Sequence, residues 1–481
     1  MNVLKRTLYI LSSLLLTGLL ACNKDLDRSP EGDLKDLMTF NDVKSALGGV
    51  YLGFKSGNYY NNRSASGSPS GWSALPELMG DDFVESFESL GNWNIMSEMT
   101  YAADNGIAAG IFIQPYEIIS RVNNLLTFLP AYETGATEEE AKLIRAQALA
   151  IRAHAHFDLM RYFAQDFGRT STALGVPYVT IFNSQKPFEN LPSRGTVKDN
   201  YDSLFQDLNA SLVAFREGGG EVAGNESRNY IDSVVVYAMR ARINYYASQW
   251  QDAIDDASVA LALRPLGNAA DYVAAFSVAG EAEPPSEVYW AIPSDGTLTP
   301  GGAISGNNPG YRITNALSTV LQSQGGAYVH PDITRFNQPG VGSVNRTLLF
   351  KYAGVRSFKV FRAGEMMLIR AEAKYRLGNP TALDDLNELR EARDVATGSE
   401  SGTALLDAIL LQRRVELLGE GHRWFDLRRT TKSIVRAECG TNGGSRAQNC
   451  TITPESRSWI FPIPFNEIKV NPNLEQNPGY N

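Results

Sequence analysis

A long run of small and apolar residues at helical spacing constrains the fold of this chain more than any other feature. The run lies within residues 137–168, and its members are Ala141, Ile144, Ala148, Ile151, Ala155, Leu159 and Tyr162. Steps of three and four place such side chains on one face of an α-helix. Thr137, followed by Glu140, predicts a capping box at the start of this helix, and Gly168 predicts its end.

The same periodicity recurs along the chain and predicts a scaffold of paired helices. Residues 196–215 form a second amphipathic pattern that ends before three glycines. Within residues 232–265, five positions have spacings close to those of a tetratricopeptide repeat: Ala241, Ala253, Ala257, Ala260 and Pro265. Small residues let two antiparallel helices approach closely, and the proline ends the pair. A looser helix pair is predicted over residues 362–394, and a further helix over residues 403–429.

Long insertions separate the predicted helix pairs. The scaffold lies mainly in residues 110–265 and 361–430, whereas inserts rich in Gly, Pro, Asn and Ser occupy mainly residues 57–101 and 266–360. The inserts contain a few short strand-like runs, such as residues 287–292. We therefore expect a mainly α fold, a tetratricopeptide-like helical-repeat scaffold with loop-rich inserts, as a single domain over residues 37–481. Long structured loops on a rigid frame are where binding usually occurs.

The first residues predict export from the cytoplasm. Lys5 and Arg6 precede an uncharged run over residues 7–20, which has the length of a signal-peptide core and is too short to span a bilayer comfortably. No later segment offers about 18 continuous apolar residues, so no transmembrane helix is predicted after it. The alternatives at its end are an ordinary signal peptide and a lipoprotein signal.

The end of the apolar run favours the lipoprotein signal. Leu-Leu-Ala-Cys, ending at Cys22, resembles a bacterial lipobox. We therefore expect residues 1–21 to be removed and Cys22 to be lipidated, which would tie the protein to a membrane surface. Residues 22–36 are polar and predict a flexible tether. Their acidic cluster resembles the export signal of surface-displayed lipoproteins, although a solvated linker has the same composition.

Charge and cysteine usage narrow the functional classes. The chain carries 44 basic and 53 acidic residues, and no basic patch for nucleic acid is evident. Cys439 and Cys450 enclose a segment rich in Gly, Asn and Ser. Outside the cytoplasm we expect them to form a disulfide, since a metal site would need further ligands nearby.

Several stretches resemble one family, the SusD-like (SusD/RagB) outer-membrane lipoproteins. Residues 412–429, QRRVELLGEGHRWFDLRR, resemble its C-terminal motif, with Gln412 in place of the usual Glu. Residues 460–480, IFPIPFNEIKVNPNLEQNPGY, resemble its terminal signature. Further similarity covers residues 116–129, 145–168 and 362–379.

The resemblance implies a surface protein that binds glycans and delivers them to a SusC-like TonB-dependent transporter in the outer membrane. Some members of the family serve peptide or glycopeptide uptake instead, which is the alternative function. The family carries no catalytic residues, so the resemblance implies a protein that is not an enzyme. It also implies an outer-membrane protein, lipid-anchored and facing the cell exterior. We expect no cofactor, and the sequence leaves open whether the protein binds a structural calcium ion.

Signatures of catalysis are few in the sequence. His154 and His156 lie two positions apart on a predicted helix, so they point to different faces. The sequence holds no His-Glu-x-x-His zinc motif, no Walker loop and no Gly-x-Ser-x-Gly elbow. Asp81 and Asp82 could cap a helix or take a cation. A surface hydrolase and a pure protein-binding scaffold are therefore the other functional classes to test.

The C-terminal motif can be interpreted as structure rather than as a site. Its apolar residues are spaced for a helix face, and its arginines can pair with Glu416, Glu420 and Asp426. Arginine forks meeting carboxylates are typical of a buried, charge-paired helix end. A phosphate or carboxylate site is the alternative.

Aromatic residues in the two inserts are the candidates for a carbohydrate site. A sugar presents a flat C–H face that a ring can cover and a rim of hydroxyls that polar side chains satisfy. The candidates are Trp72, Trp93, Tyr59, Tyr60, Tyr311, Asn62 and Asn308. Each ring has an alternative role, because an aromatic side chain in a long loop often packs that loop against the core. Trp290 lies in an apolar strand-like run and is expected in the core.

Overall fold

The computed structural model describes most of the chain. The described residues are 39–56, 59–60, 71–86, 89, 91, 93–182, 189, 191–220, 225–294, 303–307, 309–339, 345–440 and 446–480. The predicted signal peptide, Cys22 and the tether lie outside them. The chain divides into two units, residues 1–42 and 43–481. In the first unit, Thr39 and Asp42 cap each other: the Asp42 N–H donates to Thr39 Oγ1 (3.3 Å) and the Thr39 N–H to Asp42 Oδ2 (2.9 Å).

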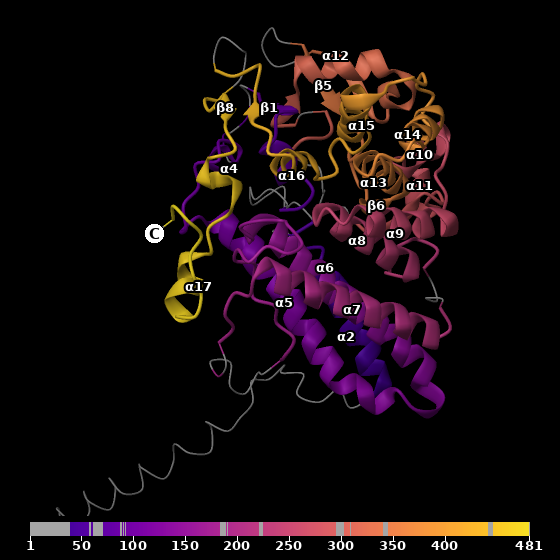
Figure 1. Ribbon diagram of the computed structural model, residues 1–481, viewed down its shortest axis with the longest axis vertical. Helices are drawn as coiled ribbons and strands as arrows, with labels where there is room; N and C mark the ends of the chain where they lie inside the picture. Colours follow the sequence, from indigo (N-terminus) through magenta and orange to yellow (C-terminus); the bar gives the residue numbers. More distant parts are fainter. Residues whose placement is uncertain are drawn as a thin grey trace, which may run out of the picture. The chain divides into compact units, whose positions relative to one another are not determined.

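Long helices dominate the second unit, which confirms the mainly α prediction. The scaffold helices are α2 (Phe40–Gly53), which belongs to this unit from Val43 on, α5 (Gly106–Phe128), α6 (Glu138–Phe163), α7 (Val197–Glu217), α8 (Ser233–Tyr246), α9 (Trp250–Leu263), α13 (Ala363–Arg376), α14 (Ala382–Glu391) and α15 (Gly402–Glu416). Successive helices pack as neighbours, α5 on α6, α6 on α7 and α8 on α9, and α13 joins the series by packing on α9 (Figure 1). Among the described residues, no helix combines the length and the apolar character needed to cross a bilayer.

Shorter elements connect or cover this scaffold. The short α-helices are α3 (Leu75–Leu78), α4 (Asn94–Ser97), α10 (Ala269–Ala275), α11 (Ala279–Ala282), α12 (Asn315–Gln324), α16 (Arg423–Arg429) and α17 (Phe465–Val470). The 3-10 turns are η1 (Leu129–Tyr132), η2 (Gly135–Thr137), η3 (Gly326–Val329) and η5 (Arg457–Trp459).

The starts of two scaffold helices show how capping differs from expectation. α7 begins with a capping box, in which Thr196 Oγ1 accepts the Asp199 N–H (3.1 Å) and the Asp199 carboxylate accepts the Thr196 N–H (3.1 Å). The box predicted at Thr137 is wrong. Thr137 closes the η2 turn, and its hydroxyl donates to the Tyr132 carbonyl (2.6 Å) instead of capping α6.

The helix predicted over residues 403–429 is two helices. α15 ends at Glu416 and α16 starts at Arg423, and between them Gly419 and Gly421 have φ values of +78° and +77°. Side-chain-bearing residues rarely adopt this conformation. A Cβ on Gly421 would lie 1.9 Å from the Trp72 carbonyl oxygen. The glycines therefore allow the chain to turn tightly against the loop that carries Trp72.

In the described parts of the chain, three small antiparallel sheets accompany the helices. β2 (Val288–Ile292) pairs with β6 (Phe358–Arg362), which confirms the strand predicted near residues 287–292. A four-stranded sheet has the order β1 (Phe83–Glu85), β3 (Tyr311–Ile313), β5 (Arg346–Leu349) and β4 (Thr334–Gln338). β7 (Ile434–Val435) pairs with β8 (Thr451–Ile452). Because β1 comes from the first insert and β3 from the second, the four-stranded sheet joins the two inserts.

Buried ion pairs hold the C-terminal motif, as its structural interpretation predicted. Arg413 and Arg429 both bond Asp426, with distances of 2.9 Å from Arg413 Nε to Oδ2 and 3.0 Å from Arg429 Nε to Oδ1. These three side chains come from α15 and α16. The pairs therefore fasten the two helices together across the glycine turn.

The other two carboxylates of the motif pair with cations outside it, contrary to the prediction. Glu416 bonds Arg362 and Arg393, each at 3.0 Å, and Glu420 bonds Arg362 (2.7 Å) and Lys351 (2.8 Å). All five side chains are at most 3% exposed. This network links α15 to β6 and to the segment after α14, far apart in the sequence.

Candidate functional site

Three of the predicted carbohydrate-binding rings lie in the core. Tyr59, Tyr60 and Trp72 are 0%, 2% and 1% exposed. The rings of Trp72 and Tyr59 meet edge to face, with centroids 4.5 Å apart. The hydroxyls of Tyr59 and Tyr60 donate to the buried Asp158 carboxylate at 2.9 Å and 2.7 Å. The prediction that these rings are open to a ligand is therefore wrong.

The tyrosine hydroxyls explain why this insert folds inward. Burial, with the nearby Asp158 carboxylate, raises the pKa of both Tyr59 and Tyr60 well above the usual range. Both phenols therefore stay protonated and act as donors to Asp158. A buried tyrosine needs a partner for its hydroxyl, and the Asp158 carboxylate on α6 provides that partner for both rings. The sequence alone could not distinguish these two tyrosines from exposed ones.

Trp93 and Tyr311 are brought together from the two inserts. Their rings stack with centroids 6.0 Å apart and planes 27° apart. Tyr311, on β3, is 1% exposed, and its hydroxyl donates to Ser97 Oγ (3.1 Å). The prediction that Tyr311 is itself an exposed ring is therefore wrong. Trp93, which precedes α4, is only partly buried, so the Tyr311 ring supports a tryptophan that keeps surface open to solvent.

Polar side chains lie near this tryptophan: Asn94 follows it in the chain, and a Cβ on Gly310 would lie 3.5 Å from Ser89 Oγ and 4.0 Å from the Trp93 ring. Ser89 Oγ donates to Glu85 Oε1 (2.6 Å), and the Asn94 amide, with its nitrogen toward Glu85, donates to the same oxygen (2.9 Å). Burial raises the pKa of Glu85. Glu85 ends β1 and Asn94 begins α4. The three polar side chains therefore form a hydrogen-bonded cluster beside the Trp93 ring, and we call Trp93 with these residues the Trp93 site.

A disulfide lies on the same side of the scaffold. Cys439 and Cys450 are bonded, with an S–S distance of 2.03 Å, as the sequence predicted. Beside it, Glu98, which follows α4, accepts the Gln448 N–H at Oε1 (3.2 Å) and the Asn449 N–H at Oε2 (2.5 Å). Figure 1 shows α4, β1 and β8 near one another on this side. No sequence signal linked the cysteine loop to the aromatic insert.

The remaining predicted polar ligands cannot be placed at the site. Asn62 and Asn308 lie outside the described residues. The neighbouring Asn307 is exposed. Arg312, next to Tyr311 on β3, is buried and donates to Glu438 Oε2 (2.7 Å). Arg312 therefore has a structural partner, and it is connected to the Trp93 site through the backbone of β3 and through its pairing with Val84 on β1.

Asp81 and Asp82 bind arginines instead of capping a helix. Arg423 Nε lies 2.6 Å from Asp81 Oδ1, and Arg414 Nε donates to Asp82 Oδ1 at 2.6 Å. Burial opposes ionisation of Asp81, but the Arg423 guanidinium lowers its pKa. These arginines supply the positive charge that the prediction assigned to a bound cation. Within the part of the chain that the structure describes, no group of three or more His, Cys, Asp or Glu side chains is placed to hold a metal ion.

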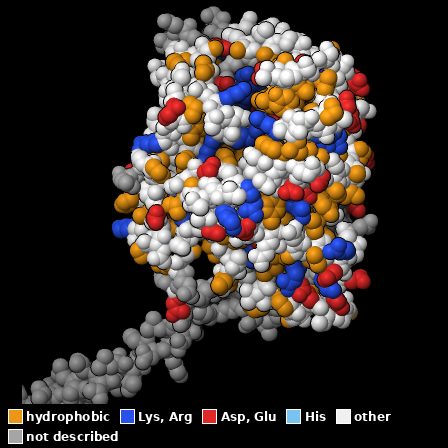
Figure 2. Space-filling view, viewed as in Figure 1, with side chains coloured by type: hydrophobic (Ala, Val, Ile, Leu, Met, Phe, Trp, Pro, Cys, Tyr) orange, Lys and Arg blue, Asp and Glu red, His pale blue; other side chains and the backbone are white. Residues whose placement is uncertain are grey.

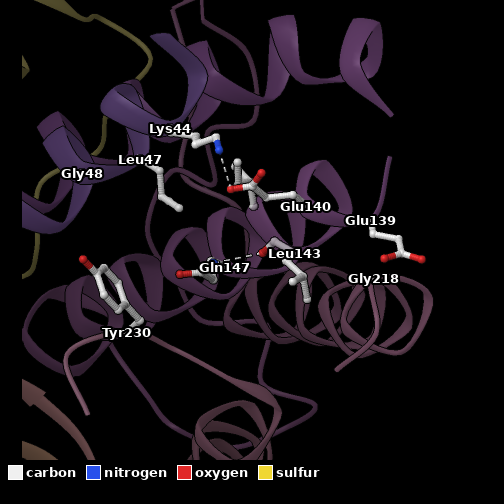
Figure 3. Close-up of a pocket in the computed structure, with 10 residues that line it drawn as sticks. Lys44, Leu47, Gly48, Glu139, Glu140, Leu143, Gln147, Gly218 and Tyr230 are labelled. Carbon is white, nitrogen blue, oxygen red and sulfur yellow. Dashed lines mark hydrogen bonds and ion pairs between the residues drawn. The ribbon is translucent and has the colours of Figure 1, made fainter. Parts of the chain in front are cut away.

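A separate cavity of about 440 Å³ lies between α2 and α6 (Figure 3). Leu47, Leu143 and Ile144 contribute apolar surface to it. Lys44 reaches Glu140 across the opening, with Nζ 2.8 Å from Oε1. Two of its charges, Lys44 and Glu140, are thus paired with each other, while the Glu139 carboxylate is exposed. The ring at this cavity, Tyr230, meets Tyr51 edge to face, whereas the partly exposed Trp93 ring is stacked on Tyr311.

Two aromatic side chains among the described residues are more exposed than Trp93. Figure 2 shows hydrophobic side chains scattered among polar and charged ones on the face in view. Among the large hydrophobic side chains that are well exposed, the aromatic ones are Tyr230 (37%) and Phe465 (57%). Phe465 lies on the short helix α17 and Tyr230 at the cavity of Figure 3. Trp93 differs from both in having a stacked ring beneath it and a polar cluster beside it.

Comparison with known protein families finds two matches. Residues 350–480 match a family described as the SusD family. Residues 26–217 match one described as starch-binding and associating with the outer membrane. The SusD-like protein P2 of Formosa agariphila is 23% identical over 97% of this chain and 98% of its own length. The SusD-like protein P38 of the same organism is 39% identical, but over only 25% of this chain and 24% of its own length.

Solved structures share the fold over nearly the whole chain. A SusD superfamily protein from Bacteroides vulgatus is 25% identical with a TM-score of 0.76, covering 92% of this chain and 99% of that protein. A SusD-like carbohydrate binding protein from the same organism is 20% identical with a TM-score of 0.74, covering 90% of this chain and 97% of that protein. The second likeness concerns the fold alone.

Proposed function

Because this chain belongs to the SusD-like family, we propose that it is a lipid-anchored surface protein that captures oligosaccharide and is not an enzyme. It hands the glycan to a SusC-like TonB-dependent transporter in the outer membrane, on the exterior of the cell. The family description of starch binding at the outer membrane supports both the ligand class and the location. The carbohydrate binding protein of the same fold is consistent with that ligand class.

The Trp93 site is the observation that carries the proposal. The partly exposed indole suits the C–H face of a sugar ring, and the stacked Tyr311 ring holds the indole in place. Glu85, Ser89 and Asn94 lie beside it with hydrogen-bonding groups that can satisfy sugar hydroxyls. A few converging polar groups next to an apolar surface are typical of small-molecule sites.

The expected affinity is modest. Covering one aromatic ring contributes about 1.5–3 kcal/mol by burial, and part of this is lost to ordering of the ligand. With a few hydrogen bonds, binding falls in the micromolar to millimolar range, roughly 4–8 kcal/mol. Such an affinity suits capture followed by release into a transporter.

The anchor and any bound ion need their own tests. Metabolic labelling with palmitate should mark the wild type and leave Cys22→Ala unmarked, because lipidation is proposed at Cys22. A structural calcium ion would raise the melting temperature of the mature protein when calcium is added and lower it again with a chelator. Unchanged melting in both additions would exclude a stabilising calcium site.

The site is tested by binding of a glycan panel to the mature protein, measured by calorimetry. Trp93→Ala should abolish detectable binding, because it removes the ring that covers the sugar. Tyr230→Ala is the matched control, since Tyr230 is also an exposed ring, 37% exposed, but lies at another cavity. It should bind as the wild type does.

The alternatives give different results in the same assay. Glycan binding that survives Trp93→Ala would overturn the site. Binding of peptides or glycopeptides but of no glycan would favour the alternative ligand class. Release of shorter sugars from the panel by purified protein would show an enzyme, and binding of no small ligand at all would leave a protein-binding scaffold.

A further inference from the structure

The loop closed by Cys439 and Cys450 is fastened to the elements that carry the Trp93 site. The Arg446 N–H donates to the Glu85 carbonyl (3.2 Å), at the end of β1. After α4, the Glu98 carboxylate receives the Gln448 and Asn449 N–H groups, and the Asn449 amide donates to the Glu98 carbonyl (3.1 Å). The described part of the loop therefore contacts both elements.

A buried arginine, Arg436, also connects the cysteine loop to the elements around the Trp93 site. The Arg436 guanidinium donates to four backbone carbonyls, those of Met79 (3.2 Å), Gly80 (3.2 Å), Ser97 (2.5 Å) and Asn449 (2.9 Å). Arg436 is 4% exposed. One side chain thus joins the segment after α3, the last residue of α4 and the cysteine loop.

The elements that carry the site cannot hold their positions alone. α4 spans Asn94–Ser97 and β1 spans Phe83–Glu85. A helix of one turn is unstable without tertiary contacts, and a three-residue strand has few ladder hydrogen bonds of its own. The placement of Trp93, Glu85 and Asn94 therefore depends on what α4 and β1 are fastened to, and the cysteine loop supplies several of those bonds.

We propose that the disulfide-closed loop is the positioning element of the Trp93 site, so that opening the disulfide weakens carbohydrate binding while the helical scaffold stays folded. The loop acts through hydrogen bonds to Glu98, which follows α4, and to the Glu85 carbonyl at the end of β1. A site held in its binding arrangement in advance loses less on binding than one that must be ordered. This inference rests on the proposed function for its binding consequence, but the positioning itself is independent of any ligand.

The disulfide is open to a chemical reductant. Cys450 is exposed and Cys439 partly buried. A dithiol such as dithiothreitol attacks one sulfur as its thiolate and forms a mixed disulfide, and its second thiolate then releases the protein thiolate. The protein gains two electrons and, at neutral pH, two protons, while the reagent becomes a cyclic disulfide. The closed and open loops can therefore be compared in the same protein.

The test compares the wild type, the Cys439→Ser/Cys450→Ser double variant and Glu98→Ala. Glu98→Ala removes the carboxylate contacts without touching the cysteines. Glu139→Ala is the control, because Glu139 is an exposed carboxylate on α6, at the cavity of Figure 3. Far-ultraviolet circular dichroism checks that each protein keeps its helices. Calorimetry with the best-bound glycan of the panel measures affinity.

A second readout does not depend on a ligand. Acrylamide quenching of tryptophan fluorescence is measured in each protein with and without Trp93→Phe, and the difference isolates Trp93. The double variant and Glu98→Ala should each change this difference and weaken glycan binding by at least about tenfold, as expected when a preorganised site is loosened. Dithiothreitol should do the same to the wild type, and Glu139→Ala should do neither.

The outcomes separate the two proposals. Unchanged Trp93 quenching in the double variant and in Glu98→Ala would overturn the positioning role, whatever the glycan result. Changed quenching with unchanged glycan affinity would overturn its consequence for binding. If the wild type binds no glycan, the proposed function fails, and the quenching difference alone decides whether the loop positions Trp93.

Discussion

Replacing Glu416 by glutamine should destabilise the protein more than any other single neutralisation of a carboxylate in the C-terminal motif. Glu416 Oε1 lies 3.0 Å from both Arg362 Nη1 and Arg393 Nη2, and Oε2 lies 3.0 Å from Arg393 Nε. The Tyr328 hydroxyl also donates to Oε2 (2.9 Å). A glutamine amide would present an NH₂ group to these donors and leave two buried guanidiniums short of one negative charge.

The size of the effect follows from burial. The Glu416 and Arg393 side chains are both 0% exposed. Breaking a buried ion pair by removing one partner costs about 3–5 kcal/mol. Unfolding entropy is about 2.1 cal/mol/K per residue, which for a unit spanning residues 43–481 is about 0.9 kcal/mol/K. The melting temperature of Glu416→Gln should therefore fall by about 3–5 °C.

The assay is urea unfolding together with calorimetric melting of the mature protein at pH 7. Glu138→Gln is the control, because its pair with Lys142 on α6 (2.8 Å) is partly exposed, with 46% of the Glu138 side chain open to solvent. An exposed pair of this kind contributes about 0.3–0.5 kcal/mol, so the control should melt close to the wild type. A loss below about 1 kcal/mol for Glu416→Gln would refute the reasoning that the buried charges depend on one another.

Acid provides a second check on the same carboxylate. Burial alone would raise the pKa of Glu416, but the guanidiniums of Arg393 and Arg362 hold it well below the usual range. A carboxyl with a depressed folded pKa contributes stability above its unfolded pKa of about 4.5 and loses it as the pH falls. The difference in unfolding free energy between wild type and Glu416→Gln should therefore shrink below pH 4.5. A difference that stays constant down to pH 2.5 would contradict the assigned pKa.

Three further predictions concern stability. Burial raises the pKa of Glu77 from 4.5 to about 8, so the wild type loses stability as the pH rises above 4.5. Between pH 4.5 and pH 7, the unfolding free energy of Glu77→Gln in urea should therefore rise by about 3 kcal/mol relative to that of the wild type. A difference that does not change with pH would contradict this. Gly421→Ala should lower the unfolding free energy by about 3 kcal/mol or more, because its Cβ would meet the Trp72 carbonyl. Gly440 has a φ of +75° but open space around it, so Gly440→Ala should lower the unfolding free energy by only about 1–2 kcal/mol. Tyr60→Phe should lose about 1–3 kcal/mol but leave glycan affinity unchanged, because the ring is 2% exposed; weakened binding would return Tyr60 to the site.

Local patterns predicted much of the scaffold. The three- and four-residue spacing around Ala148 predicted α6, and the small residues between Ala241 and Ala260 predicted the α8–α9 pair. These predictions hold because helix formation depends on contacts within a few residues, which the sequence displays directly. The disulfide between Cys439 and Cys450 was predicted on other grounds, the expected location outside the cytoplasm and the lack of further metal ligands nearby.

The order of residues alone determined that this chain builds helices, and its motifs sufficed to indicate the family. Only the tertiary structure decided which aromatic rings stay open. Tyr59 and Tyr60 turn inward because Asp158 receives their hydroxyls, 99 and 98 positions away, while Trp93 stays partly exposed on Tyr311. Exposure depends on partners distant in the chain, and a single sequence does not display those contacts, whereas helical periodicity is written into neighbouring residues.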